Sequence, residues 1–140
     1  MDAFDADVLI YACVSDHPLG ERVRALFPVE PPTTSGAVAG VGSVLLITEL
    51  LTKPMRDGAE VEVDALLALL ARLDLRPVDE ALAGLATALG ASYGLRAADA
   101  VHLATAVTTG ADRFITNSSS DFSKAISEVD VTYPDELPAP

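Results

Sequence analysis

The feature that most constrains this chain is the regular alternation of short apolar stretches with longer amphipathic ones. Stretches of strand length lie at residues 1–5, 75–78, 113–116 and 129–133. Apolar residues recur at helical spacing over residues 19–27, 60–73, 79–93 and 96–108. Strands that alternate with helices favour a parallel sheet covered by helices. We therefore predict an α/β fold, a single domain over residues 1–140 with a mainly parallel central sheet of four or five strands flanked by helices.

Several residues mark where these elements begin and end. Asp79 is a good N-cap for the helix that follows it, and Gly94 and Gly110 are typical residues to end a helix. The apolar segment 43–51 carries one acid, Glu49, and we expect Pro54 to break it.

Three segments are expected to be irregular or only locally ordered. Residues 28–42 are rich in Pro and Gly and predict a loop. Residues 117–120 form a polar turn before a helical turn over residues 121–126. Residues 134–140 contain three prolines and predict a flexible tail.

The charge of the chain excludes one class of function. Its 21 acidic and 9 basic residues give a net charge of −12, which disfavours a protein that holds nucleic acid through a broad basic surface. This charge leaves room for acids gathered around a cation and for a basic protein partner. The single cysteine, Cys13, cannot form an internal disulfide and indicates a reducing compartment. The N-terminal residues are acidic and no run of about 20 apolar residues exists, so we expect neither signal peptide nor membrane span and a cytoplasmic location.

Four acidic residues stand out by their place in the predicted elements: Asp5, Glu49, Asp99 and Asp121. Asp5 ends the first strand and Asp121 follows the turn after strand 113–116, and sites in parallel sheets form at such strand ends. Glu49 and Asp99 lie in otherwise apolar helical segments, where burial without a partner is costly. A divalent cation would remove that cost. Carboxylate oxygens without a cluster of Cys and His favour Mg²⁺ or Mn²⁺.

Each of these acids also has a simpler explanation. Asp99 near the start of a helix is typical of an N-cap, and Asp5 is typical of a turn residue. Glu49 can extend its carboxylate to solvent. The four acids together, rather than any one of them, favour a metal site.

Four segments resemble the motifs of PIN-domain ribonucleases, in the same order and over most of the chain. Residues 5–11 resemble the opening motif, residues 48–51 the second acidic motif, and residues 115–122 the last motif. Residues 95–106, which contain Asp99, look closely like the third motif, and this match is the most specific. For a chain of this length, the closest resemblance is to the toxins of bacterial VapBC toxin–antitoxin pairs.

The resemblance implies a metal-dependent endoribonuclease, the toxin of a pair, that uses Mg²⁺ or Mn²⁺. It implies an RNA substrate, inhibition by a cognate antitoxin protein, and assembly as a homodimer. In such an enzyme Asp5 and Asp99 would hold the metal, with Glu49 and Asp121 binding directly or through water. Thr116 would orient the water that attacks the phosphate.

Two positions depart from the family pattern. Asp7 stands where the family commonly has Asn, and its carboxylate adds a ligand or a hydrogen-bond acceptor together with charge repulsion. Ser118 stands where many members have an acid, whereas Asp121, directly before Phe122, matches a variant of the motif. We therefore expect Asp121, and not Ser118, to supply the fourth acid.

Other residues near the motifs receive weaker assignments. The bases that we consider for contacts with phosphate are Arg96, Lys53 and Arg56. His102 lies three residues after Asp99 on the same helix face, but we expect a packed or capping histidine. The glycine-rich residues 36–42 lack the spacing of a nucleotide-binding loop and are expected to be a flexible loop.

Three other functions remain open. Asp5 and Asp7 are spaced like the nucleophile and acid of a phosphatase of the haloacid dehalogenase type, but no lysine is well placed for that chemistry. A receiver domain is also α/β, but it needs an Asp near mid-chain, where this chain has Glu49. The third alternative is a PIN-like domain that binds protein and no longer cuts. Metal-dependent cleavage of RNA by the pure protein separates these alternatives.

Overall fold

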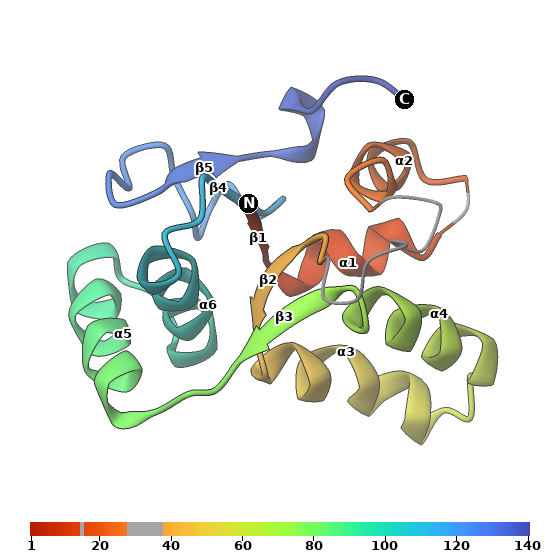
Figure 1. Cartoon of the computed structure of the whole chain (residues 1–140), viewed down its shortest axis with the longest axis horizontal. Coiled ribbons are helices and arrows are strands. Elements are labelled where there is room, and N and C mark those ends of the chain that lie inside the picture. Colours follow the sequence, from red (N-terminus) through yellow and green to blue (C-terminus); the bar gives the residue numbers. More distant parts are fainter. Residues whose placement is uncertain (15, 28–37) are drawn as a thin grey trace.

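The computed structural model of the chain describes residues 1–14, 16–27 and 38–140. The described residues form a five-stranded sheet in the order β3-β2-β1-β4-β5, in which every neighbouring pair is parallel (Figure 1). The strands are β1 (Asp2–Phe4), β2 (Gly40–Ser43), β3 (Leu73–Arg76), β4 (Arg113–Ile115) and β5 (Asp130–Thr132). This sheet confirms the predicted α/β fold, and β5 lies at one edge of it.

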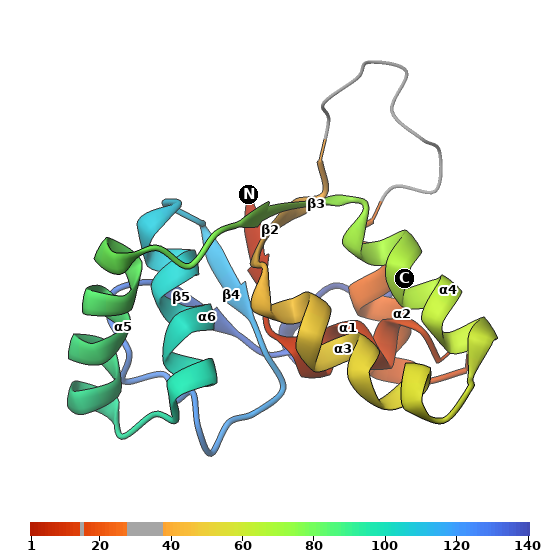
Figure 2. The same cartoon turned by 90° about the horizontal axis from the view of Figure 1, so that it is seen from below.

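In the described residues, six α-helices cover the two faces of the sheet. They are α1 (Ala6–Ala12), α2 (Pro18–Arg24), α3 (Leu45–Arg56), α4 (Glu60–Leu70), α5 (Glu80–Tyr93) and α6 (Ala97–Thr108). Figure 2 shows α5 and α6 to the left of β1 and β2, and α1 to α4 to the right. The parallel strands therefore lie between two helical layers.

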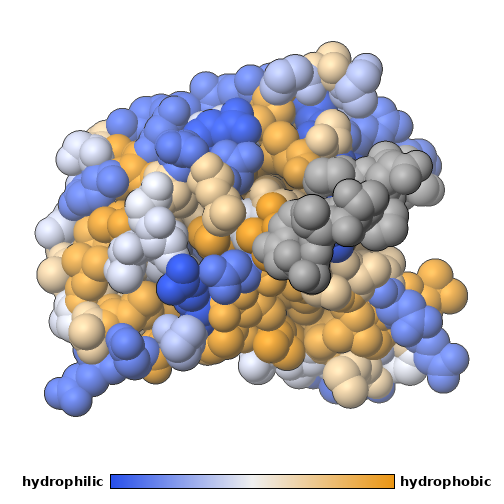
Figure 3. Space-filling view, viewed as in Figure 1, coloured by the Kyte–Doolittle hydropathy of each residue, from blue (hydrophilic) through white to orange (hydrophobic). Residues whose placement is uncertain are grey.

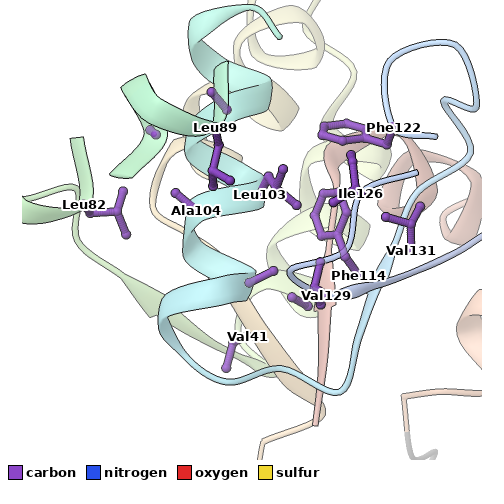
Figure 4. Packing of buried hydrophobic residues seen from close by; sticks show 14 residues of the cluster. Val41, Leu82, Leu89, Leu103, Ala104, Phe114, Phe122, Ile126, Val129 and Val131 are labelled. Atoms are coloured by element: carbon purple, nitrogen blue, oxygen red, sulfur yellow. The ribbon is translucent and has the colours of Figure 1, made fainter. Parts of the chain in front are cut away.

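Alternate residues of the central strands supply two separate cores, because successive side chains of a strand point to opposite faces. Ala3 and Phe114 pack in the cluster with α5 and α6, and Phe4 and Ile115 pack in the cluster with the other helices. Figure 4 shows the first cluster, in which the ring of Phe114 meets that of Phe122 edge-on with 4.9 Å between centroids.

The helix boundaries follow from the residues that mark them. The side chain of Asp79 accepts a hydrogen bond from the Leu82 amide at 2.8 Å and caps α5. Gly94 ends α5 with a φ of 67°, and Gly110, after α6, has the same φ, a conformation that glycine adopts without strain. The boundary residues predicted for these two helices are confirmed.

The prediction of a loop over residues 28–42 is wrong at its end, where β2 begins at Gly40. A Cβ added at Gly40 would lie 2.4 Å from the carbonyl oxygen of Asp2, and one added at Gly42 would lie 2.5 Å from Leu46. Glycine is therefore needed for close packing of this strand, although it weakens the strand signal in the sequence. Residues 28–37 lie outside the described residues.

Four further predictions need correction. Pro54 does not break the helix, because it lies within α3, which runs on to Arg56 before Gly58 turns the chain with a φ of 67°. Residues 121–126 form turns and no helix, and the backbone hydrogen bond within this segment joins the Ile126 amide to the Ser123 carbonyl. Strand β3 lies at 73–76 rather than at 75–78, and α4 ends at Leu70.

The C-terminal tail is packed over its first half rather than loose as expected. Pro134 begins a short 3₁₀ helix (η1, Pro134–Glu136), and Leu137 is buried among the helices on the α1 to α4 side. Arg22 donates hydrogen bonds to the carbonyl oxygens of Asp135 and Leu137 at 2.9 and 2.8 Å. Residues 138–140 are exposed.

The surface carries apolar side chains on two neighbouring helices. In Figure 3, hydrophobic residues gather over the lower centre of the view, where α3 and α4 lie in Figure 1. Met55 on α3 and Val61 on α4 are among the exposed large hydrophobic residues, and Val61 is 85% exposed. No helix of the described residues is long and apolar enough to cross a bilayer.

Candidate active site

Asp5 lies at the carboxyl end of β1, where it also caps α1. One carboxylate oxygen accepts the Ala6 amide and the other accepts the hydroxyl of Thr116, both at 2.8 Å. The residue is only 6% exposed. Burial raises the pKa of the Asp5 carboxyl, and the bond from Thr116 opposes the rise. Asp5 is thus the N-cap of a helix and not the turn residue of the simpler explanation, and the capping bond does not explain why an ionisable side chain is buried there.

Thr116 follows β4 and extends its pairing, since its amide donates to the Thr132 carbonyl at 3.1 Å. Its side chain is buried, and its hydroxyl donates to Asp5 while it accepts the Ser118 amide at 3.1 Å. The proton of this hydroxyl is therefore already bound to a carboxylate. Thr116 therefore orients the carboxylate of Asp5, and its role in orienting water stays a prediction.

Asp7 lies on the first turn of α1, beside Asp5. One of its carboxylate oxygens accepts the Asn117 amide at 3.1 Å, and the other is buried without a hydrogen-bond partner in the part of the chain that the structure describes. Burial, followed by the charge of Asp5, raises the pKa of Asp7 to about 7. A buried carboxylate oxygen without a hydrogen-bond donor is costly, and a bound cation would offset that cost.

Asp99 lies in the first turn of α6 but does not cap this helix, since Arg96 is the N-cap. Its carboxyl is partly buried, and burial raises its pKa, followed by the charges of Asp5 and Asp121. Glu49 adds to the same rise. The prediction that Asp99 lies near the acids of the other motifs agrees with these interactions.

Glu49 reaches the site from the opposite helical layer. Its carboxylate lies 2.9 Å from the Nε2 atom of His102, and its side chain is 34% exposed. His102 itself is completely buried. The imidazole, expected to be only a packed or capping residue, is therefore the hydrogen-bond partner of a predicted site residue.

Asp121 is exposed on the turn after β4, and the hydroxyl of Ser118 donates to its carboxylate at 2.8 Å. The two residues that the sequence analysis weighed against each other are hydrogen-bonded partners. Asp121 is the acid of this pair, and its charge contributes to the raised pKa of Asp99.

The donor chemistry of this group fits a divalent cation, although the side chains are not arranged around one. Among the described residues, no three Asp, Glu, His or Cys side chains converge closely enough to hold a metal ion. Asp5, Glu49 and Asp121 each accept a hydrogen bond from a neighbouring side chain. Asp5, Asp7 and Asp99 take part in none of the ion pairs of the described residues. Hard oxygen donors and mutual repulsion are the conditions that favour Mg²⁺ or Mn²⁺.

Sequence analysis named all the acids at this edge but missed the groups that hold them. The amide of Asn117 and the imidazole of His102 each bond to an acid across the fold. The spacing of His102 from Asp99 was the one sequence signal for its place on the same helix face.

These features define a class of protein: an α/β domain with a carboxylate site at the carboxyl edge of a parallel sheet. A family model for the PIN domain matches residues 3–125, and the chain belongs to the PIN domain family. The match includes Asp5, Glu49, Asp99 and Asp121. PIN domains are generally nucleases, and these nucleases generally use divalent metals.

Two solved structures are similar to this chain over nearly its whole length. One is a toxin–antitoxin complex from Klebsiella pneumoniae, with 22% identity, a TM-score of 0.72, and coverage of 98% of this chain and 100% of that chain. The other is VapBC2 from Rickettsia felis bound to a DNA fragment from their promoter, with 16% identity, a TM-score of 0.66, and coverage of 94% and 97%. At these identities the likeness shows the fold. No curated protein matches the chain.

Proposed function

We propose that this protein is a metal-dependent endoribonuclease and the toxin of a VapBC-type toxin–antitoxin pair. The observation that carries the proposal is the group of carboxylates at the carboxyl edge of β1 and β4, where burial first, and then the charge of neighbouring acids, raises the pKa of Asp5, Asp7 and Asp99. Membership of the PIN family and the likeness to two toxin–antitoxin structures support it. The cost of gathering these acids is explained when a cation occupies the site.

The residues of the site divide into ligands and supports. Asp5 and Asp99 would hold Mg²⁺ or Mn²⁺, with Glu49 and Asp121 binding directly or through water. When bound, the cation lowers the pKa of water and neutralises charge that develops on the phosphate. Thr116 keeps the carboxylate of Asp5 in place through its hydroxyl.

The basic residues suit contacts with the phosphates on either side of the site. Most Lys and Arg side chains of the chain bind the protein's own carbonyl or carboxylate oxygens, as do Arg22, Arg24, Arg76, Arg113 and Lys124. Lys53 and Arg96 form no hydrogen bond or ion pair within the described residues. Lys53 lies one turn after Glu49 on α3, and Arg96 directly precedes α6. We assign both, together with the exposed Arg56, to the RNA backbone.

A protein partner fits the charge and the surface of the molecule. A cognate antitoxin that brings an Arg side chain to the carboxylates would pair with them and block the metal and the phosphate. The exposed apolar residues of α3 and α4, such as Met55 and Val61, give such a partner a surface to cover. We also propose a homodimer, by analogy with the family.

Cleavage of single-stranded RNA by the purified protein tests this function. We expect cleavage with millimolar Mg²⁺ or Mn²⁺, none after chelation, and loss of activity in Asp99→Asn with the fold retained, because the substitution removes a ligand charge. An Asp99→Asn protein that cuts at the wild-type rate would contradict the metal site.

The same assay separates the alternatives. Release of phosphate from small phosphomonoesters without RNA cleavage would favour a phosphatase that uses Asp5 as nucleophile. A folded protein that binds metal but cuts no RNA would favour a PIN-like binding domain. The family match over residues 3–125 favours neither the phosphatase nor the receiver alternative.

A further inference from the structure

We propose that His102 is a positioning residue that holds the carboxylate of Glu49 at the acid cluster and thereby sets the affinity of the site for its divalent cation. This inference deepens the proposed function and rests on it. It assigns a role to a residue that the sequence analysis treated as part of the core.

The contact joins the two helical layers of the protein around the carboxyl edge of the sheet. His102 is on α6 and Glu49 is on α3, and these helices lie on opposite sides of the central strands (Figure 2). The Nε2 atom of His102 lies 2.9 Å from a carboxylate oxygen of Glu49. Glu49 in turn acts on the pKa of Asp5 and of Asp99, which places its charge at the cluster.

The surroundings of His102 show that packing alone does not require an imidazole. The side chain is completely buried, and its Nδ1 atom has no hydrogen-bond partner in the part of the chain that the structure describes. A leucine or methionine would fill the same volume without a buried unpaired nitrogen. The bond from Nε2 to Glu49 is therefore the hydrogen bond that the ring makes among the described residues, and the ring also acts electrostatically on Asp5 and Asp99, whose pKa values it lowers.

Glu49 depends on a fixed hydrogen-bond donor, such as His102, more than the other acids of the site do. Its side chain is long and 34% exposed, and like charges on Asp5 and Asp99 repel it. A glutamate under these conditions extends to solvent unless a fixed donor holds it. The buried ring has no freedom to follow the carboxylate outward, so it restrains Glu49 at the site, as outer ligands do at metal centres.

Binding of Mn²⁺ to the full chain, measured by titration calorimetry without RNA, tests this role. Replacement of an outer partner of a metal ligand typically costs 10–100-fold in metal affinity, so we expect His102→Leu to weaken Mn²⁺ binding by about tenfold. His102→Gln keeps an amide donor near the place of Nε2 and is expected to stay within about threefold of the wild type. In a Glu49→Gln background, His102→Leu should change the affinity by less than about twofold, because the two residues act as one unit.

Thr105→Val is the matched control. Thr105 is buried on the same helix, and its hydroxyl donates to the carbonyl of Val101 within α6 rather than to an acid. This variant should keep the wild-type Mn²⁺ affinity even if its melting temperature falls. Melting curves of all variants identify any that fail to fold, and His102→Gln then carries the test.

Several results would overturn the inference. The first is a wild-type protein that does not bind Mn²⁺, and the second is an equal Mn²⁺ affinity in His102→Leu and the wild type. The third is an equal loss of Mn²⁺ affinity in His102→Leu and His102→Gln. The last is about a tenfold loss of Mn²⁺ affinity when His102→Leu is made in the Glu49→Gln background. A wild-type protein that binds Mn²⁺ with the expected pattern of variants but cuts no RNA would contradict the proposed endoribonuclease alone.

Discussion

Aspartate side chains at the two ends of the sheet differ in their ion pairs and in the direction of their pKa shifts. At the amino end, Asp2 accepts two bonds from Arg113, both at 2.9 Å, and Asp112 pairs with the N-terminal amino group. That hydrogen bond lowers the pKa of Asp112. At the carboxyl end, Asp5, Asp7 and Asp99 take part in none of the ion pairs of the described residues, and burial raises the pKa of each. The acids at the amino end of the sheet are paired with positive groups of the chain itself, whereas Asp5, Asp7 and Asp99 at the carboxyl end have no such ion pair among the described residues.

This difference indicates which end of the sheet lowers the free energy of unfolding. Acids paired with bases stabilise the folded state, whereas buried acids that repel one another destabilise it. Such costs collect at functional sites, where a ligand offsets them. Matched substitutions at the two ends of the sheet test this comparison.

The largest expected effect is on cleavage of RNA. Asp5→Asn keeps an acceptor for the Thr116 hydroxyl but removes a charge from the proposed metal site. Since changes in the outer partners of a metal already cost 10–100-fold, we expect the loss in rate to exceed about 100-fold. Asp2→Asn removes the same charge at the opposite end of β1 and should leave the rate within about twofold. Initial rates on a single-stranded RNA with saturating Mn²⁺ measure both, and equal losses would end the functional distinction between the two ends.

Stability without metal should change in opposite directions at the two ends. The folded state keeps the proton of Asp7 up to about pH 7, whereas the unfolded chain releases it near 3.8. The free energy of unfolding therefore falls as pH rises from about 4 to about 7 and stays low above that range. Asp7→Asn removes this fall and should stabilise the protein at about pH 8 by about 2 kcal/mol, after allowance for the partial exposure of the side chain.

Asp2→Asn should have the opposite effect on stability. It breaks the paired bonds to Arg113 and should destabilise the protein by about 1 kcal/mol at about pH 8. Urea denaturation in the presence of a chelator, at about pH 5 and about pH 8, measures both variants. Destabilisation by Asp7→Asn at about pH 8 would show that its carboxylate is tolerated as it stands, and the contrast between the ends would fail.

The fold was predictable where local signals agreed with the tertiary structure. The strand before Asp5, the cap at Asp79 and the stop at Gly94 each have a local cause that the sequence displays. Strand β2 was missed because its glycines at 40 and 42 serve close packing against other elements. A glycine that allows close packing against residues distant in the sequence weakens the local sequence pattern of a strand.

The site was predictable in its acids but not in their supports. Strand ends pointed to Asp5 and Asp121, and apolar helical segments to Glu49 and Asp99, before the motif resemblance joined the four acids in one predicted site. The bond between Glu49 and His102 joins residues that are 53 positions apart and in different layers. No periodicity within one helix reports such a contact.

The smallest expected effect concerns the turn after β4 and decides whether Asp121 or Ser118 matters there. Asp121 is exposed, so its contribution to metal binding is modest, and we expect Asp121→Asn to raise the Mn²⁺ concentration for half-maximal cleavage by about threefold. Because the Ser118 hydroxyl bonds to the Asp121 carboxylate, Ser118→Ala only frees that carboxylate and should have an effect below about twofold. The double variant should behave like Asp121→Asn, since removal of the acid leaves the hydroxyl nothing to hold. If Ser118→Ala instead adds its own shift in the Asp121→Asn background, Ser118 acts directly at the site and the carboxyl edge draws on three acids and a hydroxyl.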